Sequence, residues 1–104
     1  MKQQPIRVMR DVAPDHPALA GHFPGAPLLP GAALLSEVLE AILDAPELAA
    51  RIGNAATVEA AKFLAPARPG DVLCIALEAE PRAVRFEVTA ERRTIARGRF
   101  TGER

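Results

Sequence analysis

The spacing of the prolines limits what this chain can fold into more than any other feature of its sequence. Five of the ten prolines fall between residues 13 and 30, whereas residues 31–44 contain none. Proline has no backbone N–H and holds φ in a narrow range, so this density forbids a helix. Residues 13–30 are therefore expected to form an ordered loop, and the helix-forming part of the chain begins only after Pro30.

The proline-free segment that follows predicts a helix over residues 31–43. It is rich in Ala, Leu and Glu, which are strong helix formers, and its apolar residues occupy most of the helical circumference. Such a helix is expected to be enclosed by other elements rather than laid on a surface. Pro46 ends it, and residues 47–52 are expected to add a helical turn before Gly53.

Alternating apolar and polar residues predict strands on both sides of the helix. In one of them, Val84, Phe86 and Val88 alternate with polar side chains. The expected strands lie at residues 4–12, up to residue 64, around 73–77 and around 84–89, with a connection at 65–71 and hairpin turns at 80–82 and 91–93. One separate strand, a helix and then consecutive hairpin strands indicate an α+β fold with an antiparallel sheet curled around the helix. At 104 residues the chain is expected to form one domain, residues 1–104.

The overall charge argues against one large class of function. Thirteen basic residues balance thirteen acidic ones, which speaks against a nucleic-acid surface that neutralises phosphates. Residues 82–104 nevertheless carry seven arginines against three glutamates. This local excess suits either an acidic protein partner or a solvated face of the sheet.

Two further features concern the expected localisation of the chain and its single cysteine. Residues 1–10 contain no long apolar run, so neither a secretion signal nor a membrane span is expected, and a cytoplasmic protein follows. The single cysteine, Cys74, lies among apolar neighbours, so it is expected to be buried packing in a strand.

His22 and Gly31 are the residues of this sequence that suggest chemistry. The proline-rich loop positions the imidazole of His22 at a low entropic cost, and Gly31 stands at the expected helix start. Free N–H groups at a helix start favour an oxyanion, and glycine lets a ligand approach them. A base close to such a helix end can remove a proton next to a thioester carbonyl. The alternative is that His22 only bonds a carbonyl of its own loop.

A metal centre is not expected. His16 and His22 are the two histidines of the chain, and only scattered carboxylates stand near them to complete a set of three or four ligands. We therefore expect neither a metal nor a cofactor, and we place His16 on the surface of the loop.

The stretch that contains His22 and Gly31 resembles the signature of a known enzyme family. Gly21-His22-Phe23-Pro24-Gly25, followed after two residues by Leu28-Leu29-Pro30-Gly31, is similar to the motif of the (3R)-hydroxyacyl-acyl-carrier-protein dehydratases. A second match runs from Lys62-Phe63 to Pro69-Gly70-Asp71, so the resemblance covers residues 10–100 of the chain. In length, the chain is more similar to the small dehydratase-like proteins of aryl-polyene pathways.

This resemblance implies a hot-dog fold, in which a curved antiparallel sheet wraps a long central helix. It also implies that two protomers join edge to edge, as a homodimer or a larger even-numbered homo-oligomer, with the active sites at their interface. The implied partner is an acyl carrier protein that bears the substrate, and neither nucleic acid nor a membrane is implied.

The site residues of the family carry over in part. The resemblance makes His22 the group that acts on the α-proton or the hydroxyl of the substrate, and it makes the amide of Gly31 the donor to the thioester carbonyl. It assigns substrate binding to the neighbouring motif residues Phe23, Gly25, Leu28 and Leu29. The depth of the acyl tunnel would depend on both protomers, with Leu28, Leu29 and Phe63 among its lining residues. In the family, an acidic residue on the partner's helix completes the catalytic pair.

The chain departs from the family at this acidic position, five residues after the helix-start glycine, where it has Ser36. A serine hydroxyl donates a hydrogen bond but cannot replace a carboxylic acid near neutral pH. Glu37 is rotated by about 100° on the helix and should point elsewhere, whereas Glu40 lies one turn after Ser36 on the same face. Either Glu40 supplies the missing carboxylate while Ser36 bonds a water or the substrate hydroxyl, or Glu40 sits at the solvent edge and the site lacks its acid.

Three functions are open at this point. The leading hypothesis is dehydration of 3-hydroxyacyl thioesters on acyl carrier protein to trans-2-enoyl thioesters, with His22, Glu40 and Ser36 in the catalytic site. A hot-dog thioesterase would use Glu37 or Glu40 to direct water at the carbonyl. A protomer without its acid would instead bind acyl thioesters, or pair with an active homologue in a heterodimer.

Overall fold

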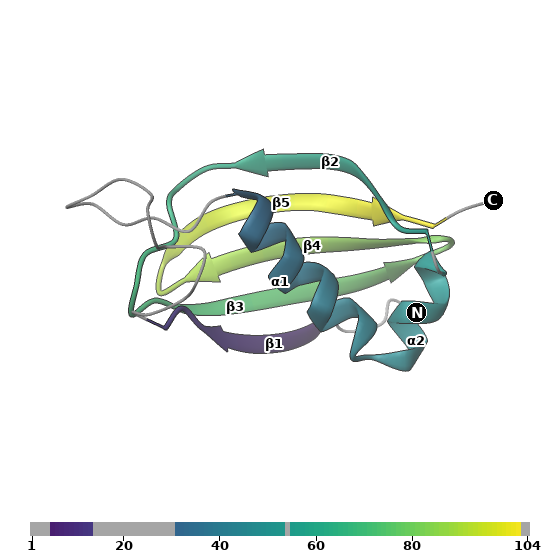
Figure 1. Ribbon diagram of the computed structural model, residues 1–104, viewed down its shortest axis with the longest axis horizontal. Coiled ribbons are helices and arrows are strands. Elements are labelled where there is room, and N and C mark those ends of the chain that lie inside the picture. Colours follow the sequence, from purple (N-terminus) through teal and green to yellow (C-terminus); the bar gives the residue numbers. More distant parts are fainter. Residues whose placement is uncertain (1–4, 14–30, 54, 103–104) are drawn as a thin grey trace.

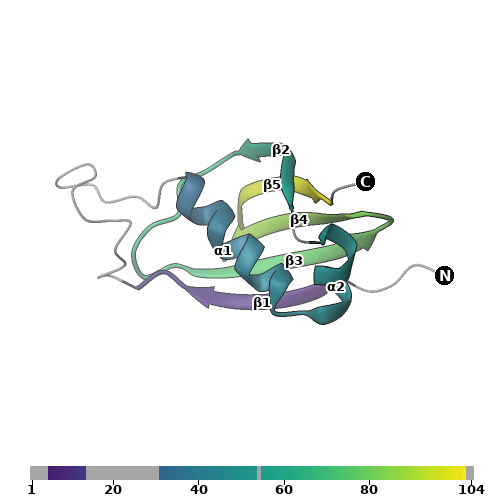
Figure 2. The same cartoon turned by 45° about the vertical axis from the view of Figure 1, so that its right-hand side comes forward.

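The computed structural model describes residues 5–13, 31–53 and 55–102. In chain order, the elements are β1 (Ile6–Asp11), α1 (Gly31–Leu43), α2 (Pro46–Ile52), β2 (Thr57–Phe63), β3 (Val72–Glu80), β4 (Ala83–Ala90) and β5 (Arg93–Thr101). The strands form an antiparallel sheet in the order β1-β3-β4-β5-β2, so β1 and β2 are its two edges. The helix α1 crosses one face of this curved sheet, and α2 lies near one end of it (Figure 1 and Figure 2). No helix in the described segments is long and apolar enough to cross a membrane.

The predicted helices and strands are confirmed, whereas the loop predicted for residues 13–30 lies outside the described residues from residue 14 on. The long helix runs from Gly31 to Leu43, and the short one begins at Pro46, where a missing N–H costs nothing in the first helical turn. Both predicted hairpins are present, β3–β4 and β4–β5. Their turns are tight, since Arg82 and Glu91 adopt positive φ angles of 60° and 55°.

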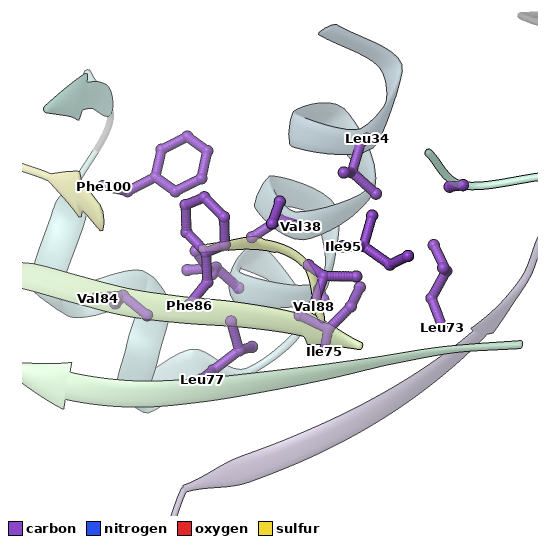
Figure 3. Packing of buried hydrophobic residues seen from close by; sticks show 14 of the residues in the cluster. Leu34, Val38, Leu73, Ile75, Leu77, Val84, Phe86, Val88, Ile95 and Phe100 are labelled. Atoms are coloured by element: carbon purple, nitrogen blue, oxygen red, sulfur yellow. The ribbon is translucent and has the colours of Figure 1, made fainter. Parts of the chain in front are cut away.

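The core lies between the helices and the sheet. Inward side chains of three strands meet α1 there, and every fully buried side chain of the described residues is apolar. Figure 3 labels Leu34 and Val38 of α1, Leu73, Ile75 and Leu77 of β3, Val84, Phe86 and Val88 of β4, and Ile95 and Phe100 of β5. The rings of Phe86 and Phe100 have their centroids 5.6 Å apart, and aliphatic side chains fill most of the remaining space.

Within one chain, α1 is less enclosed than the sequence predicts. Its sheet-facing side is buried, but its opposite side, which includes Ser36 and Glu40, is exposed. The physical reason is that one sheet layer covers only one side of a helix. The apolar residues around the rest of the helix therefore lie in partly exposed positions.

The prediction that Cys74 is buried packing is wrong. Leu73 and Ile75 on either side of it point into the core, so Cys74 points to the outer face of the sheet, where it is half-buried. The sequence places Leu73, Ile75 and Leu77 on one face of this strand and Cys74 and Ala76 on the other, but since both sets are apolar, it does not show which face is the outer one.

The outer face also carries several of the arginines near the end of the chain. Three of them form ion pairs with glutamates: Arg85 with Glu80 at 3.0 Å, Arg97 with Glu87 at 3.8 Å, and Arg99 with Glu59 at 3.1 Å. Glu59 and Glu80 lie outside residues 82–104, so this pairing offsets part of the local positive excess.

Gly98 on β5 is a position where an added methyl group should disturb the sheet. A Cβ there would overlap the carbonyl oxygen of Ala60, at the bulge of β2, and would come within 2.6 Å of the Phe86 ring. Both neighbours are held by the sheet, so we expect Gly98→Ala to lower the free energy of unfolding by about 2 kcal/mol. Urea unfolding measures this change. The control Arg92→Ala, in the exposed β4–β5 turn, should change it by less than about 0.5 kcal/mol, and equal effects of the two variants would contradict close packing at Gly98.

Candidate active site

The structure describes three of the eight predicted site residues, and all three lie on α1: Gly31, Ser36 and Glu40. The others, His22, Phe23, Gly25, Leu28 and Leu29, lie outside the described residues. Their roles stay predictions.

Gly31 is the first residue of α1 and lies against the ring of Phe63, at the end of β2. A Cβ at residue 31 would come within 3.0 Å of the Cζ atom of this ring, so glycine allows the ring to lie where it does. The first turn of α1 holds no acidic side chain, and its N–H groups have no partner within the helix itself. These groups form the positive end of the helix dipole and can bind a carbonyl oxygen that takes up negative charge.

A cavity of about 380 Å³, here called the helix-start cavity, lies beside Gly31. Its lining comes from α1, from the end of β2, from the segment after β2 and from β5: Gly31, Leu34, Phe63, Leu64, Ala65, Pro66, Ala67 and Ile95. The side chains of all these residues are apolar and can pack against an acyl chain, while backbone polar groups also contribute to the lining and the helix start lies next to it.

Most of the wall of this cavity was not found from the sequence. The pattern of prolines there predicts only a connection between two strands at residues 65–71. A usable signal was the position of Pro66, since it falls between Lys62-Phe63 and Pro69-Gly70-Asp71, the two parts of the second motif match. A proline-stiffened segment inside a family motif is a candidate for lining a site.

The hydroxyl of Ser36 bonds its own helix. Its Oγ donates to the carbonyl oxygen of Ala32 at 3.1 Å, on the exposed side of α1. A hydroxyl has one proton to donate, and this bond uses it, so only lone pairs are left for a water or a substrate. In this arrangement Ser36 accepts a hydrogen bond and does not donate one outward.

Glu40 lies near the edge strand β1. Its Oε1 is 3.9 Å from a guanidinium nitrogen of Arg10, and Asp44 is closer to the same nitrogen, at 3.1 Å. The Glu40 side chain is 64% exposed. In the single chain, Glu40 therefore sits at the solvent edge, and Asp44 is the closer partner of Arg10.

Glu40 and Gly31 of one chain are well separated. The nine steps from residue 31 to residue 40 span about 14 Å along a helix. Glu40 also points to β1, whereas Phe63, which contacts Gly31, belongs to β2 at the opposite edge of the sheet. The carboxylate of Glu40 cannot reach a group bound at Gly31 of the same chain.

A larger hollow, of about 720 Å³, lies on the outer face of the sheet and contains none of the predicted site residues. Charged side chains of all five strands line it: Arg7, Glu59, Lys62, Glu78, Arg85, Glu87, Arg97 and Arg99. Opposite charges pair across it, which is typical of a solvated sheet face. Over the described part of the chain, no three of its Cys, Asp and Glu side chains gather as a candidate metal site.

Known protein families include one that matches nearly the whole chain. The ApeI-like family, described as ApeI dehydratase, matches residues 1–99. Among curated relatives, the 3-hydroxyacyl-acyl-carrier-protein dehydratase FabZ of Symbiobacterium thermophilum is 35% identical over 77 residues, which cover 70% of this chain and 54% of the relative. The chain thus spans about half the length of the curated relatives that it matches.

Solved structures share the fold. The dehydratase heterocomplex ApeI:P from Xenorhabdus doucetiae contains a chain that is similar with a TM-score of 0.81 at 25% identity, over 95% of this chain and 87% of that chain. The fluoroacetyl-CoA-specific thioesterase FlK is similar with a TM-score of 0.60 at 20% identity, over 94% of this chain and 90% of that chain, which concerns the fold alone. The α+β hot-dog fold predicted from the sequence is confirmed.

The contact between Gly31 and Phe63 predicts that two substitutions are coupled. Gly31→Ala places a methyl group within 3.0 to 3.3 Å of three atoms of the Phe63 ring. The ring must move aside, so Gly31→Ala should cost about 1 kcal/mol more in the wild type than in a Phe63→Leu background. Urea unfolding of the four proteins measures this coupling. Strictly additive free energies would contradict the packed contact.

Proposed function

This chain belongs to the ApeI-like dehydratase family, and from that membership we propose that it dehydrates 3-hydroxyacyl thioesters on an acyl carrier protein to trans-2-enoyl thioesters. The observation that carries the proposal is the helix-start cavity, where the amide of Gly31 stands next to an apolar lining. A thioester carbonyl fits at the amide and an acyl chain fits against the lining. The proposal needs neither a metal nor a cofactor.

The proposed reaction is an elimination of water. His22 takes the α-proton of the thioester, and the electron pair left behind forms the double bond between the α- and β-carbons. The β-hydroxyl leaves as water after it receives a proton from a general acid. The amide of Gly31 stabilises the negative charge that develops on the thioester oxygen.

We assign completion of the site to a second protomer that pairs with β2. Every residue of β2 is exposed, although Val58 and Phe63 are apolar. Among the described residues, one side of this edge strand pairs with no other strand, so a partner strand can bond its N–H and C=O groups. Phe63 lies on β2 and also lines the helix-start cavity, so a protomer paired there adds its own surface next to the cavity. A homodimer, or a larger even-numbered homo-oligomer, follows from this pairing.

The proposed acid is Glu40 of the partner subunit, because Glu40 cannot reach Gly31 of its own chain. Since Glu40 lies by β1, at the edge opposite β2, pairing at β2 alone does not bring it to Gly31, and the proposal requires the partner's α1 to approach the site as well. The contact with Arg10 does not prevent this role, since Asp44 is the closer partner of that guanidinium. Ser36, one turn earlier, accepts a hydrogen bond from a water or from the substrate hydroxyl. The loop residues Phe23, Gly25, Leu28 and Leu29 complete the substrate path in this proposal.

A second candidate function is favoured by Ser36. Its hydroxyl is bound to its own helix at the position where the family has an acid. A protomer of this kind would bind acyl thioesters without turnover, or supply His22 and Gly31 to a heterodimer whose other subunit supplies the acid. The similar dehydratase from Xenorhabdus doucetiae is a heterocomplex.

The leading proposal is tested by the ultraviolet absorbance of the enoyl thioester during hydration of an enoyl-carrier substrate. His22→Ala and Glu40→Gln should each lower kcat/KM by about 10²–10⁴-fold, because each removes one member of the acid–base pair. Glu37→Gln is the matched control on the adjacent helix position and should change kcat/KM by less than about threefold. Equal losses in Glu37→Gln and Glu40→Gln would contradict the assignment of the acid. Release of free thiol by the wild type would identify a thioesterase.

The substitution Ser36→Glu separates the two candidate functions. If Glu40 supplies the acid, the wild type turns over and a second carboxylate one turn away should change the rate by less than about tenfold. We expect this result, measured in the same absorbance assay. An inactive wild type that gains activity only as Ser36→Glu, and not as the uncharged control Ser36→Gln, would identify the natural protein as a partner subunit.

A further inference from the structure

The wall of the helix-start cavity is only partly held by the sheet. The N–H groups of Leu64 and Ala65 donate to the carbonyl oxygen of Ile95, at 2.8 and 3.3 Å, and so extend the pairing of β2 with β5. Pro66 has no N–H, so this pairing cannot continue through it. Ala67, the next residue, forms a β-bridge and is 2% exposed, so the wall is anchored on both sides of Pro66, and at Pro66 itself the support comes from a side chain.

Arg93 supplies that support from the start of β5. One terminal nitrogen of its guanidinium donates to the carbonyl oxygen of Pro66 at 3.2 Å, and the other donates to Oδ2 of Asp71 at 3.0 Å. A planar guanidinium can make two such bonds in a fixed geometry, which a lysine ammonium cannot reproduce. The side chain of Arg93 thus links the cavity wall at Pro66 to Asp71, at the end of the connection between β2 and β3.

Asp71 anchors this contact to the rest of the molecule. Its Oδ2 also accepts the N–H of Arg68 at 2.9 Å, and its carbonyl oxygen accepts the N–H of Val12 at 2.8 Å. The N–H of Gly70 donates back to the carbonyl oxygen of Val12 at 2.8 Å. The connection from Pro66 to Asp71 is therefore fixed both to β5 and to the segment that follows β1.

The Arg93–Asp71 pair is more buried than the ion pairs on the outer face. The side chains of Arg93 and Asp71 are 35% and 16% exposed, whereas those of Arg97 and Glu87 are 56% and 49% exposed. Water screens an exposed pair and weakens it, but it screens a partly buried pair less. The difference from the Arg99–Glu80 pair, at 37% and 20%, is small, so Arg93 is set apart mainly by its second bond, to the carbonyl oxygen of Pro66.

We propose that Arg93 and Asp71 are positioning residues that hold the Pro66 wall of the helix-start cavity, and that they thereby set the size of the acyl group that the cavity accepts. The inference rests on the proposed function for the identity of the ligand, an acyl thioester. The cavity is open toward solvent in the single chain, and a wall held in place limits the acyl group on the side of Pro66. A wall that is released admits longer chains and packs less well against short ones.

The test compares Arg93→Met, Arg93→Lys and Asp71→Asn with the wild type and with the matched control Arg85→Met, which breaks an ion pair on the outer face. Two quantities are measured on each folded protein. The first is the rate of hydrogen exchange at the amides of Leu64 and Ala65, which reports opening of the wall without any ligand. The second is the ratio of the dissociation constants for S-butyryl-pantetheine and S-octanoyl-pantetheine, obtained by NMR titration.

Arg93→Met should speed exchange at both amides by about tenfold or more, and it should shift the binding ratio about tenfold toward the octanoyl thioester. Arg93→Lys and Asp71→Asn should give smaller changes in the same direction, because each keeps part of the contact. Arg85→Met should change neither quantity by more than about twofold. If Arg93→Met does not fold, Arg93→Lys and Asp71→Asn carry the comparison.

Unchanged exchange in the Arg93 and Asp71 variants would overturn the inference. Faster exchange with an unchanged binding ratio would also overturn it, because the pair would then serve stability alone. The exchange result needs no ligand, whereas the binding ratio requires a wild type that binds the two thioesters. A wild type that binds neither would refute the proposed function itself, and with it the role in acyl size, so the two failures are distinguishable.

Discussion

The burial of one side of α1 against the sheet is the interaction on which the rest of the structure depends. Leu34, Val38 and Ile42 are almost completely buried there, and each such side chain contributes about 1.5–3 kcal/mol of burial free energy. This packing fixes both the place and the rotation of α1. It sets Gly31 beside Phe63 at one edge of the sheet, and it turns Ser36 to the uncovered side.

Under the proposed function, the same packing leaves a single chain incomplete as a site. One sheet covers one side of the helix, so the side that carries the polar positions remains open, and β2 is exposed along its full length. A carboxylate on α1 and the amide at its start are separated by the length of the helix between them. Under the proposed function, catalysis is a property of an assembly of two protomers, and the second protomer covers what the sheet cannot.

Location, more than number, decides what the charged residues of this chain do. Counted along the sequence, the arginines near its end suggest one positive patch. In the structure, Arg97 pairs with a glutamate on the exposed outer face, where an ion pair contributes little. Arg93 donates to the carbonyl oxygen of Pro66, in the connection between β2 and β3, so it contacts the wall of the helix-start cavity. Arg10 points toward α1 from an edge strand and meets Asp44.

Neighbouring residues alone were enough to predict the helix start at Gly31 and the strands, because proline exclusion and side-chain alternation are local rules. The outward position of Cys74 escaped those rules, since its neighbours are apolar on both faces of β3. Of the candidate site, the sequence indicated Gly31, Ser36 and Glu40 on α1. The role of His22 remains a prediction. Only the tertiary structure decided that Glu40 lies by Arg10 and that Arg93 holds Pro66, which is 27 residues away in the chain. A long charged side chain bonds any carboxylate or carbonyl within its reach, and the folded backbone determines which one is there.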